Sequence, residues 1–187
     1  THWQVDAQLV HDYIWKSGDT IDWLEDMGVT FAGALKNFPD SEQTWHVVHP
    51  EGGGRPGARA ANSMTKVIYD YCLELGVEFQ FNSPAQRLTK TGEKVTGFVA
   101  RHENGETYEV ECAATIIATG GFGSNGQMVQ EYCNYTLGKD MISFMVPGIV
   151  GEGIKMAWEA GAGHGRMEME RITGTPLPGA STGKWPM

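Results

Sequence analysis

The chain has 187 residues, of which 41% are hydrophobic and 20% charged, and a formal net charge of −9. This composition excludes a disordered chain and indicates a folded, water-soluble domain, or one domain with part of a second. The negative charge and the absence of a basic run argue against a nucleic-acid partner, because such affinity depends on clustered Lys and Arg.

The three cysteines are widely spaced and odd in number, so we expect buried free thiols rather than a disulfide framework or a metal site. The longest apolar stretch, residues 141–150, is interrupted by Pro147 and Gly148 and is too short to cross a bilayer. We therefore expect no membrane span. The first residues show no signal-peptide pattern, and the choice between a cytoplasmic and an exported protein stays open.

Two amphipathic helices are predicted in the first half of the chain. Hydrophobic residues at helical spacing predict one helix that begins after the N-cap Asp6 and ends at Gly28. A second helix is predicted over residues 59–75, with Gly76 in the left-handed conformation at its end. Residues 45–49, between the two helices, are predicted to form a short strand.

Runs rich in β-branched and aromatic residues then predict a sheet. Residues 95–102 and 106–112 alternate in polarity and are joined through Asn104-Gly105, a dipeptide that favours a tight hairpin turn. Residues 113–118 form a small, apolar run that predicts a buried central strand. Further strands are predicted over residues 77–81 and 85–88.

Two short helices are predicted after the sheet, over residues 127–135 and 152–160, and the tail from residue 173 is predicted to be irregular. Together the elements predict an α+β fold with a central sheet, a β-hairpin and flanking helices.

The glycine-rich loop at residues 52–57 matches the dinucleotide fingerprint Gly-x-Gly-x-x-Gly. It lies between a predicted strand and a predicted helix, as in a nucleotide-binding βαβ unit. Pro56 argues against that role, because it lacks the amide that should face a pyrophosphate. A plain surface loop, and a substrate or flavin loop in which Arg55 and Arg59 face an anion, are the alternatives.

A second match, at Gly121, Gly123 and Gly126, follows the predicted central strand. Ligands of α/β sheets bind at the carboxyl ends of strands, where small residues let a cofactor lie against the main chain. Residues 118–121 are therefore candidates for a cofactor site, and a plain tight turn is the alternative.

The remaining polar residues give no catalytic pair and no metal site. His46 and His49, for example, lie three positions apart on a predicted strand, which places them on opposite faces.

Several segments, in order, resemble the flavoprotein family of soluble fumarate reductases, urocanate reductases and 3-ketosteroid dehydrogenases. Residues 118–122 (ATGGF), with Asn125, resemble the strand end beside the flavin, and residues 151–157 (GEGIKMA) resemble the Thr-Gly-Asp-Gly helix opening of the family. The other similar segments are residues 19–29, 52–57, 76–88, 94–98 and 160–162, so that the resemblance covers most of residues 5–172.

The resemblance implies FAD as the cofactor and a role for two groups of residues. Residues 1–143 would be the middle part of a FAD-binding domain, an α/β fold, and residues 144–187 the beginning of a capping domain. Arg55 and Arg59 would lie on the substrate-side loop. The implied cofactor-binding residues are Ala85, Ala118, Thr119, Gly120, Gly121, Gly151 and Glu152.

Two features of the family have no match in this sequence. The fingerprint strand with its ribose-binding acid does not precede Thr1, and the half that supplies the arginine proton donor and a further substrate histidine does not follow. We therefore expect an internal fragment with no intact catalytic residues, which binds FAD weakly or not at all. Val146 stands where fumarate reductases have a substrate-binding histidine, and Val150 stands at the threonine position. The former indicates a substrate other than fumarate.

By this resemblance, the whole protein would transfer a hydride between flavin and an activated C–C bond of a small substrate, with an unidentified electron-transfer partner. A stand-alone α+β binding module and a nucleotide-binding unit at residues 52–57 are the alternatives. We further expect residues 119–121 to end the central strand at an open concavity, so that Gly120→Val would lower FAD occupancy more than it disturbs folding.

Overall fold

A computed structural model of the protein describes residues 6–36, 39–54, 60–140, 147–165 and 167–168. Arg55, Arg59, Val146 and the tail from residue 173 lie outside these ranges. The chain divides into two compact units, Thr1–Phe79 and Gln80–Met187. Each unit is described by itself below.

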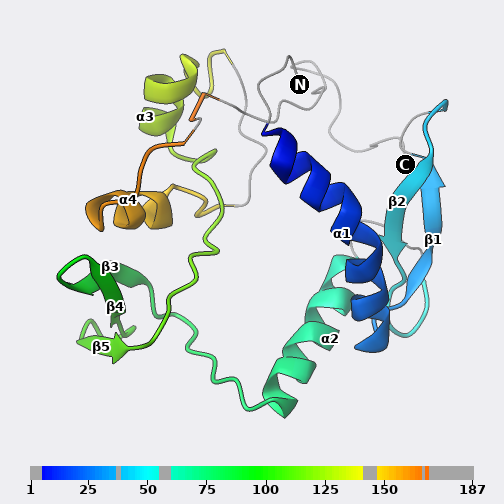
Figure 1. The fold of residues 1–187 in the computed structure, drawn as a ribbon, viewed down its shortest axis with the longest axis horizontal. Helices are drawn as coiled ribbons and strands as arrows, with labels where there is room; N and C mark the ends of the chain where they lie inside the picture. The colour runs from blue at the N-terminus through cyan, green and yellow to red at the C-terminus, as the bar shows by residue number, and fades with distance from the viewer. Residues whose placement is uncertain (1–5, 37–38, 55–59, 141–146, 166, 169–187) are drawn as a thin grey trace. The chain divides into compact units, whose positions relative to one another are not determined.

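The first unit contains two helices and a β-hairpin (Figure 1). Helix α1 (Ala7–Asp26) begins as predicted, because the Asp6 carboxylate accepts hydrogen bonds from the backbone N–H groups of Gln8 at 2.9 Å and Leu9 at 3.3 Å. Helix α2 (Ala61–Glu74) is followed by Gly76, whose φ of 81° confirms the predicted left-handed residue.

The hairpin of the first unit joins β1 (Phe31–Lys36) and β2 (Gln43–Val48) in antiparallel pairing. Strand β2 was predicted, whereas β1 was not. The described residues contain no parallel strand pair, so β2, the loop after it and α2 do not form a βαβ unit. This finding removes the structural basis of a nucleotide-binding unit at residues 52–57.

The second unit contains a three-stranded antiparallel sheet in the order β3–β4–β5, formed by Ala85–Thr91, Lys94–Arg101 and Thr107–Glu111. The predicted hairpin turn is confirmed: Gly105 has a φ of 90°, and the Asn104 side chain accepts a hydrogen bond from the backbone N–H of Glu106 at 3.0 Å. A Cβ at Gly97 would lie 1.9 Å from the carbonyl oxygen of Val110, so only glycine allows β4 and β5 to approach here.

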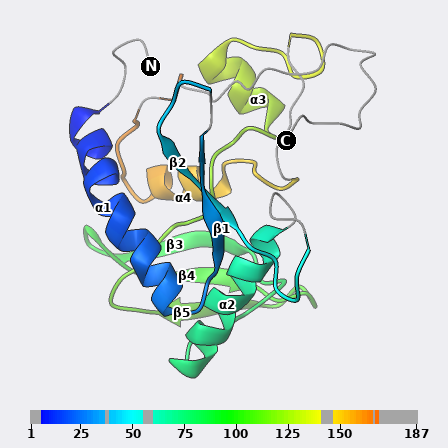
Figure 2. The same cartoon turned by 90° about the vertical axis from the view of Figure 1, so that its right-hand side faces the viewer.

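Three helical segments follow the sheet: α3 (Gly126–Met128), the π-helical turn η2 (Val129–Cys133) and α4 (Glu152–Glu159). The first two together replace the single helix predicted over residues 127–135. Helix α4 contacts β3, and Figure 2 shows the helix beside the sheet. The buried core of the unit consists of Ala100, Met128, Val129, Cys133 and Met156.

Two predicted strands are wrong. Residues 77–81 and 113–118 have no strand conformation, and Ile116 and Phe81 are 91% and 68% exposed. A strand requires a neighbour that exchanges backbone hydrogen bonds with it, and no described segment pairs with either run. The sheet of this unit therefore consists of β3, β4 and β5, without the predicted central strand.

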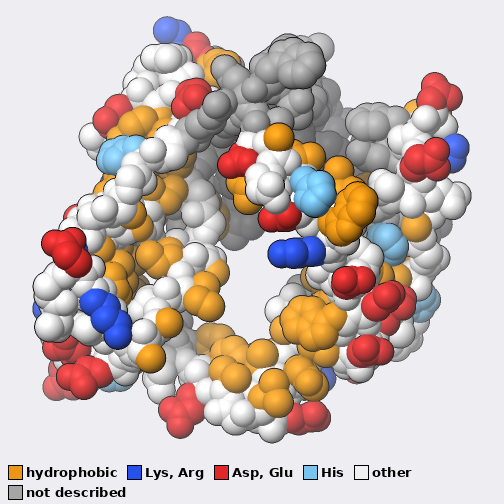
Figure 3. Space-filling model, viewed as in Figure 1, with side chains coloured by type: hydrophobic (Ala, Val, Ile, Leu, Met, Phe, Trp, Pro, Cys, Tyr) orange, Lys and Arg blue, Asp and Glu red, His pale blue; other side chains and the backbone are white. Residues whose placement is uncertain are grey.

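Fewer side chains are buried than the sequence predicted. Only Cys133 is a buried thiol, whereas Cys72 and Cys112 are half-buried, and none of the three forms a disulfide bond. No residue of α1 or α2 is buried, and β2 is the main neighbour of α2 in the described part of the chain. Figure 3 shows hydrophobic side chains, in orange, at the visible surface over these helices. Within the described ranges, no helix has both the length and the apolar character needed to cross a bilayer.

Candidate functional site

Two segments that are about 30 residues apart in sequence meet in the second unit. The backbone N–H of Ser124 donates to the carbonyl oxygen of Ile149 at 2.9 Å. A Cβ at Gly153 would lie 2.1 Å from Thr119 Oγ1 and 2.6 Å from Ile117 Cγ2. The absence of a side chain at Gly153 therefore lets the first turn of α4 lie directly against residues 117–119.

Two features of the structure require glycine at position 151, directly before α4. Its φ of 81° lies in the left-handed region, which disfavours other residues. A Cβ there would also lie 2.7 Å from Met128 Sδ and 3.0 Å from Phe122 Cβ. Gly151 thus fixes both the direction in which α4 begins and its close contact with the segment that ends at Phe122.

The Asn125 side chain joins the same two segments. Its Oδ1 accepts a hydrogen bond from the backbone N–H of Met128 at 3.1 Å and so caps α3. Its Nδ2 donates to the carbonyl oxygen of Val150 at 2.9 Å, immediately before Gly151. One half-buried amide therefore connects the start of α3 with the start of α4.

A groove of about 190 Å³ lies between the start of β3 and one side of α4. It brings together Ala85 and Glu152, two of the residues that the sequence predicted for cofactor binding. The other lining residues are Gln86, Lys155, Met156 and Glu159. The groove carries two carboxylates, on Glu152 and Glu159, and one ammonium group, on Lys155. It therefore suits a neutral ligand group with hydroxyls better than an anionic one.

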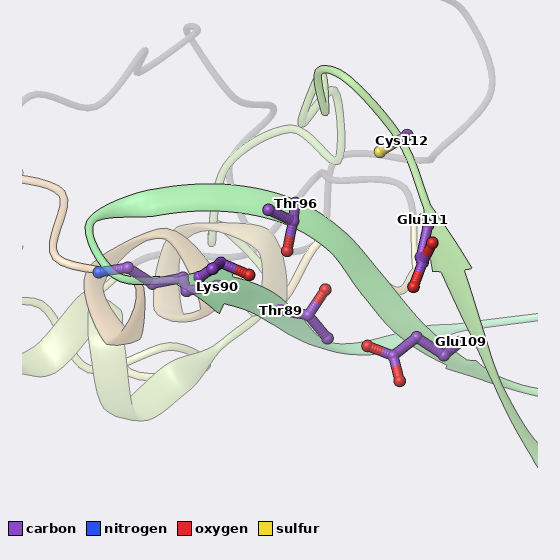
Figure 4. A pocket seen from close by; sticks show the side chains of 7 residues that line it. Thr89, Lys90, Thr96, Glu109, Glu111 and Cys112 are labelled. Atoms are coloured by element: carbon purple, nitrogen blue, oxygen red, sulfur yellow. The ribbon is translucent and has the colours of Figure 1, made fainter.

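A larger hollow of about 570 Å³ lies on a face of the three-stranded sheet (Figure 4). Thr89, Thr96, Glu109 and Glu111 line it, together with Lys90, Thr91 and Cys112. Lys90 Nζ donates to the carbonyl oxygen of Ala160 at 2.6 Å, so this ammonium group binds the end of α4. Among the described residues, no group of His, Cys, Asp and Glu side chains is suited to holding a metal ion. We assign no chemistry to this hollow.

The family of the chain follows from a comparison with known proteins. The model of a family described as "FAD binding domain" matches residues 1–179. The chain belongs to this FAD-binding domain family. This result confirms the family that the sequence resembled, and FAD is the cofactor of that domain.

One curated relative of this FAD-binding domain is a vinyl phenol reductase from Lactiplantibacillus plantarum, which is 29% identical over 162 residues. The alignment covers 86% of this chain and 31% of the relative, so the chain spans about a third of that protein.

Two solved structures have the same fold. One is the open conformation of a flavocytochrome c3 fumarate reductase, with a TM-score of 0.66 and 26% identity over 79% of this chain and 25% of that chain. The other is a 3-ketosteroid-delta4-(5alpha)-dehydrogenase from Rhodococcus jostii RHA1, with a TM-score of 0.68 and 23% identity over 84% of this chain and 38% of that chain. They confirm the predicted mixed helices and sheets as part of an FAD-binding α/β fold.

The four predicted cofactor residues from Ala118 to Gly121 are exposed, and they do not end a strand. Gly120 has a φ of 75°, and a Cβ there would lie 3.4 Å from Ile149 Cδ1. Gly121 differs, because its φ is not positive and a Cβ there would meet no atom within 4 Å. Among the described residues, Gly121 therefore has open space where a side chain would lie.

The resemblance placed Asn125 beside the flavin-side segment and Gly153 within the Thr-Gly-Asp-Gly segment, but neither was a candidate site residue. An Asn directly before a short predicted helix is an N-cap signal, and it could have identified the first. The close approach at Gly153 had no such signal, because its neighbours Ile117 and Thr119 lie more than 30 positions earlier in the chain.

An aromatic cluster contains Phe122, at the end of one of the two segments, and Trp158 of α4. The ring centroid of Tyr132 lies 6.1 Å from that of Phe122 and 5.9 Å from that of Trp158, which stacks on His164 at 4.0 Å. Loss of hydration, followed by the nearby Glu131 carboxylate, raises the pKa of Tyr132 above its usual value of 10.0. Its phenol therefore stays protonated at neutral pH.

Proposed function

We propose that this chain is the part of an FAD-dependent oxidoreductase that holds the cofactor on the side of Ala85, residues 118–121 and Gly151-Glu152. The whole protein would transfer a hydride between flavin and an activated C–C bond of a small substrate. Membership of the FAD-binding domain family supports the cofactor. The names of the relatives, a vinyl phenol reductase and a fumarate reductase, support the reaction class.

The observation that carries this proposal is the convergence of separate segments in one unit. Ala85 and Glu152 line the same groove, and Gly151 and Gly153 lie against residues 117–122. FAD supplies a hydride acceptor and donor when it is bound. The chain's own contribution is an open glycine, Gly121, and hydrogen-bonding groups on Gln86 and Glu152 that suit the hydroxyls of a ribityl chain or a ribose.

Three finer assignments belong to this proposal. Residues 1–143 would be part of the FAD-binding domain and residues 144–187 the beginning of the capping domain. Arg55 and Arg59 would face an anionic group of the substrate. Val146 at the position of a substrate histidine favours a substrate other than fumarate, and the electron-transfer partner stays unidentified.

The test is a comparison of Gly121→Val with Gly163→Val in the complete protein. Both glycines have φ outside the left-handed region and open space around the added Cβ. Neither substitution should change stability by more than about 0.5 kcal/mol. If Gly121 faces the cofactor, Gly121→Val alone should weaken FAD binding, by about tenfold or more.

FAD content after purification and the dissociation constant from a fluorescence titration give the measurement. Equal FAD affinity in Gly121→Val and the unaltered protein would show that this turn does not face the cofactor. Gly121→Val replaces the Gly120→Val experiment that the sequence suggested, because a branched residue at a φ of 75° is strained whether or not FAD binds.

A further inference from the structure

The Asn125 side chain makes two contacts that neither aspartate nor serine would provide together. Its carbonyl oxygen accepts from the backbone N–H of Met128, and its amide nitrogen donates to the carbonyl oxygen of Val150. Aspartate could cap α3 but has no hydrogen to donate to Val150, and serine could cap α3 but is too short to reach both partners. The backbone does not require Asn, because φ of −97° and ψ of 96° at this position are ordinary extended values.

The carbonyl group that accepts from the Asn125 amide nitrogen lies directly before the start of helix α4. Val150 directly precedes Gly151, the left-handed residue before α4, and Glu152, the first residue of that helix. A backbone bond also joins the two segments, since the Ser124 N–H donates to the carbonyl oxygen of Ile149. The Asn125 N–H donates to the carbonyl oxygen of Phe122 at 2.8 Å within its own turn. The amide of Asn125 therefore adds a side-chain hydrogen bond between residues 120–126 and residues 149–151.

We propose that Asn125 is a positioning residue of the FAD site, which sets the spacing between Gly121 and the Gly151-Glu152 turn. It acts through the backbone of Val150 and is not assigned a contact with FAD. The proposal rests on the proposed function, because it presumes that both turns face the same cofactor. Loss of the Nδ2 bond would let the 149–151 turn move away from Gly121 while the cap on α3 stays in place.

Asn125→Asp in the complete protein removes this bond, because it keeps the cap acceptor and lacks the donor, and it adds a negative charge that the control variant below adds as well. The expected results are a weakening of FAD binding by about fivefold to tenfold, the scale of one hydrogen bond, and an altered visible circular dichroism spectrum of the bound flavin. The spectrum reports the surroundings of the flavin, which a merely structural role would leave unchanged.

Asn104→Asp is the matched control. The Asn104 side chain also makes two hydrogen bonds, both to Glu106 in the β4–β5 turn, and the same substitution removes the same donor. It should lower thermal stability at least as much as Asn125→Asp and leave the FAD affinity and flavin spectrum unchanged.

Unaltered FAD affinity and spectrum in Asn125→Asp would overturn the proposal. So would a loss of FAD that follows the melting temperature equally in both variants, because the role of Asn125 would then be structural only. If the unaltered protein itself binds no FAD, the proposed function fails first, which is a separate outcome.

Discussion

Gly153→Ala probes the contact between α4 and residues 117–119 with a single methyl group. The added Cβ would lie 2.1 Å from Thr119 Oγ1, 2.6 Å from Ile117 Cγ2 and 3.2 Å from Thr119 Cβ. The Thr119 hydroxyl and the Ile117 methyl could move only if their side chains changed rotamer, and Thr119 Cβ is fixed by its own backbone. We therefore expect α4 to shift or these side chains to leave their preferred rotamers.

A second helical glycine provides a reference for the expected change in the free energy of unfolding. Gly18 lies inside α1, and a Cβ there would meet no atom within 4 Å. Gly18→Ala should stabilise the protein by about 1 kcal/mol, because alanine favours the helix. Gly153→Ala gains up to a similar amount but incurs an overpacking cost of about 1–3 kcal/mol. The two variants should therefore differ by about 1–3 kcal/mol, with Gly153→Ala the less stable.

Urea unfolding of both variants, followed by far-ultraviolet circular dichroism, gives the measurement. Adding Thr119→Ala to Gly153→Ala should recover part of the loss, with a coupling of at least about 0.5 kcal/mol, since the two residues would then no longer clash fully. Equal stabilisation by Gly18→Ala and Gly153→Ala would refute the reasoning, because α4 would then not lie against residues 117–119.

Two further predictions concern lysines. Lys90→Met removes the ammonium group that binds the carbonyl oxygen of Ala160. It should lower the free energy of unfolding in urea by about 0.5 kcal/mol. Lys94→Met is the control, and an equal loss in both variants would argue against a specific role for Lys90. A hydrogen bond from Lys66 to Asp70, with the attraction between their charges, raises the pKa of Lys66 above 10.5. A raised folded-state pKa means that this pair stabilises α2 below pH 10.5 and loses its effect as pH rises through the raised value. In Asp70→Asn the NMR-measured pKa of Lys66 should fall, and an unchanged pKa would show that the pair does not form in solution.

The elements that depend on nearby residues were predictable from the sequence. Asp6 caps α1 through N–H groups two and three positions away, and Asn104-Gly105 closes its hairpin through Glu106. Helix α4 likewise begins and ends at the glycines that flank it. In each case the signal and the structure that it specifies lie within one turn of the chain.

The features that depend on distant partners were not predictable in this way. Residues 113–118 have the composition of a buried strand, but composition does not name the strand that must pair with it. The sequence likewise did not reveal that Gly153 approaches Thr119, because no local pattern encodes a contact between residues 34 positions apart. The resemblance to known flavoproteins named both turns as cofactor segments, and the structure adds that Gly151 and Gly153 lie against residues 117–122.

The order of the strands in the second unit has a consequence for behaviour in concentrated solution. Strand β5 is only five residues long and, among the described residues, pairs with β4 on one side alone. Within the described ranges, its other edge has no partner strand, and such an edge can pair with a strand of a second molecule. Glu109 and Glu111 lie on this short edge strand and are exposed. Two copies that met edge to edge would bring these carboxylates together, and their repulsion disfavours the growth of a shared sheet between molecules.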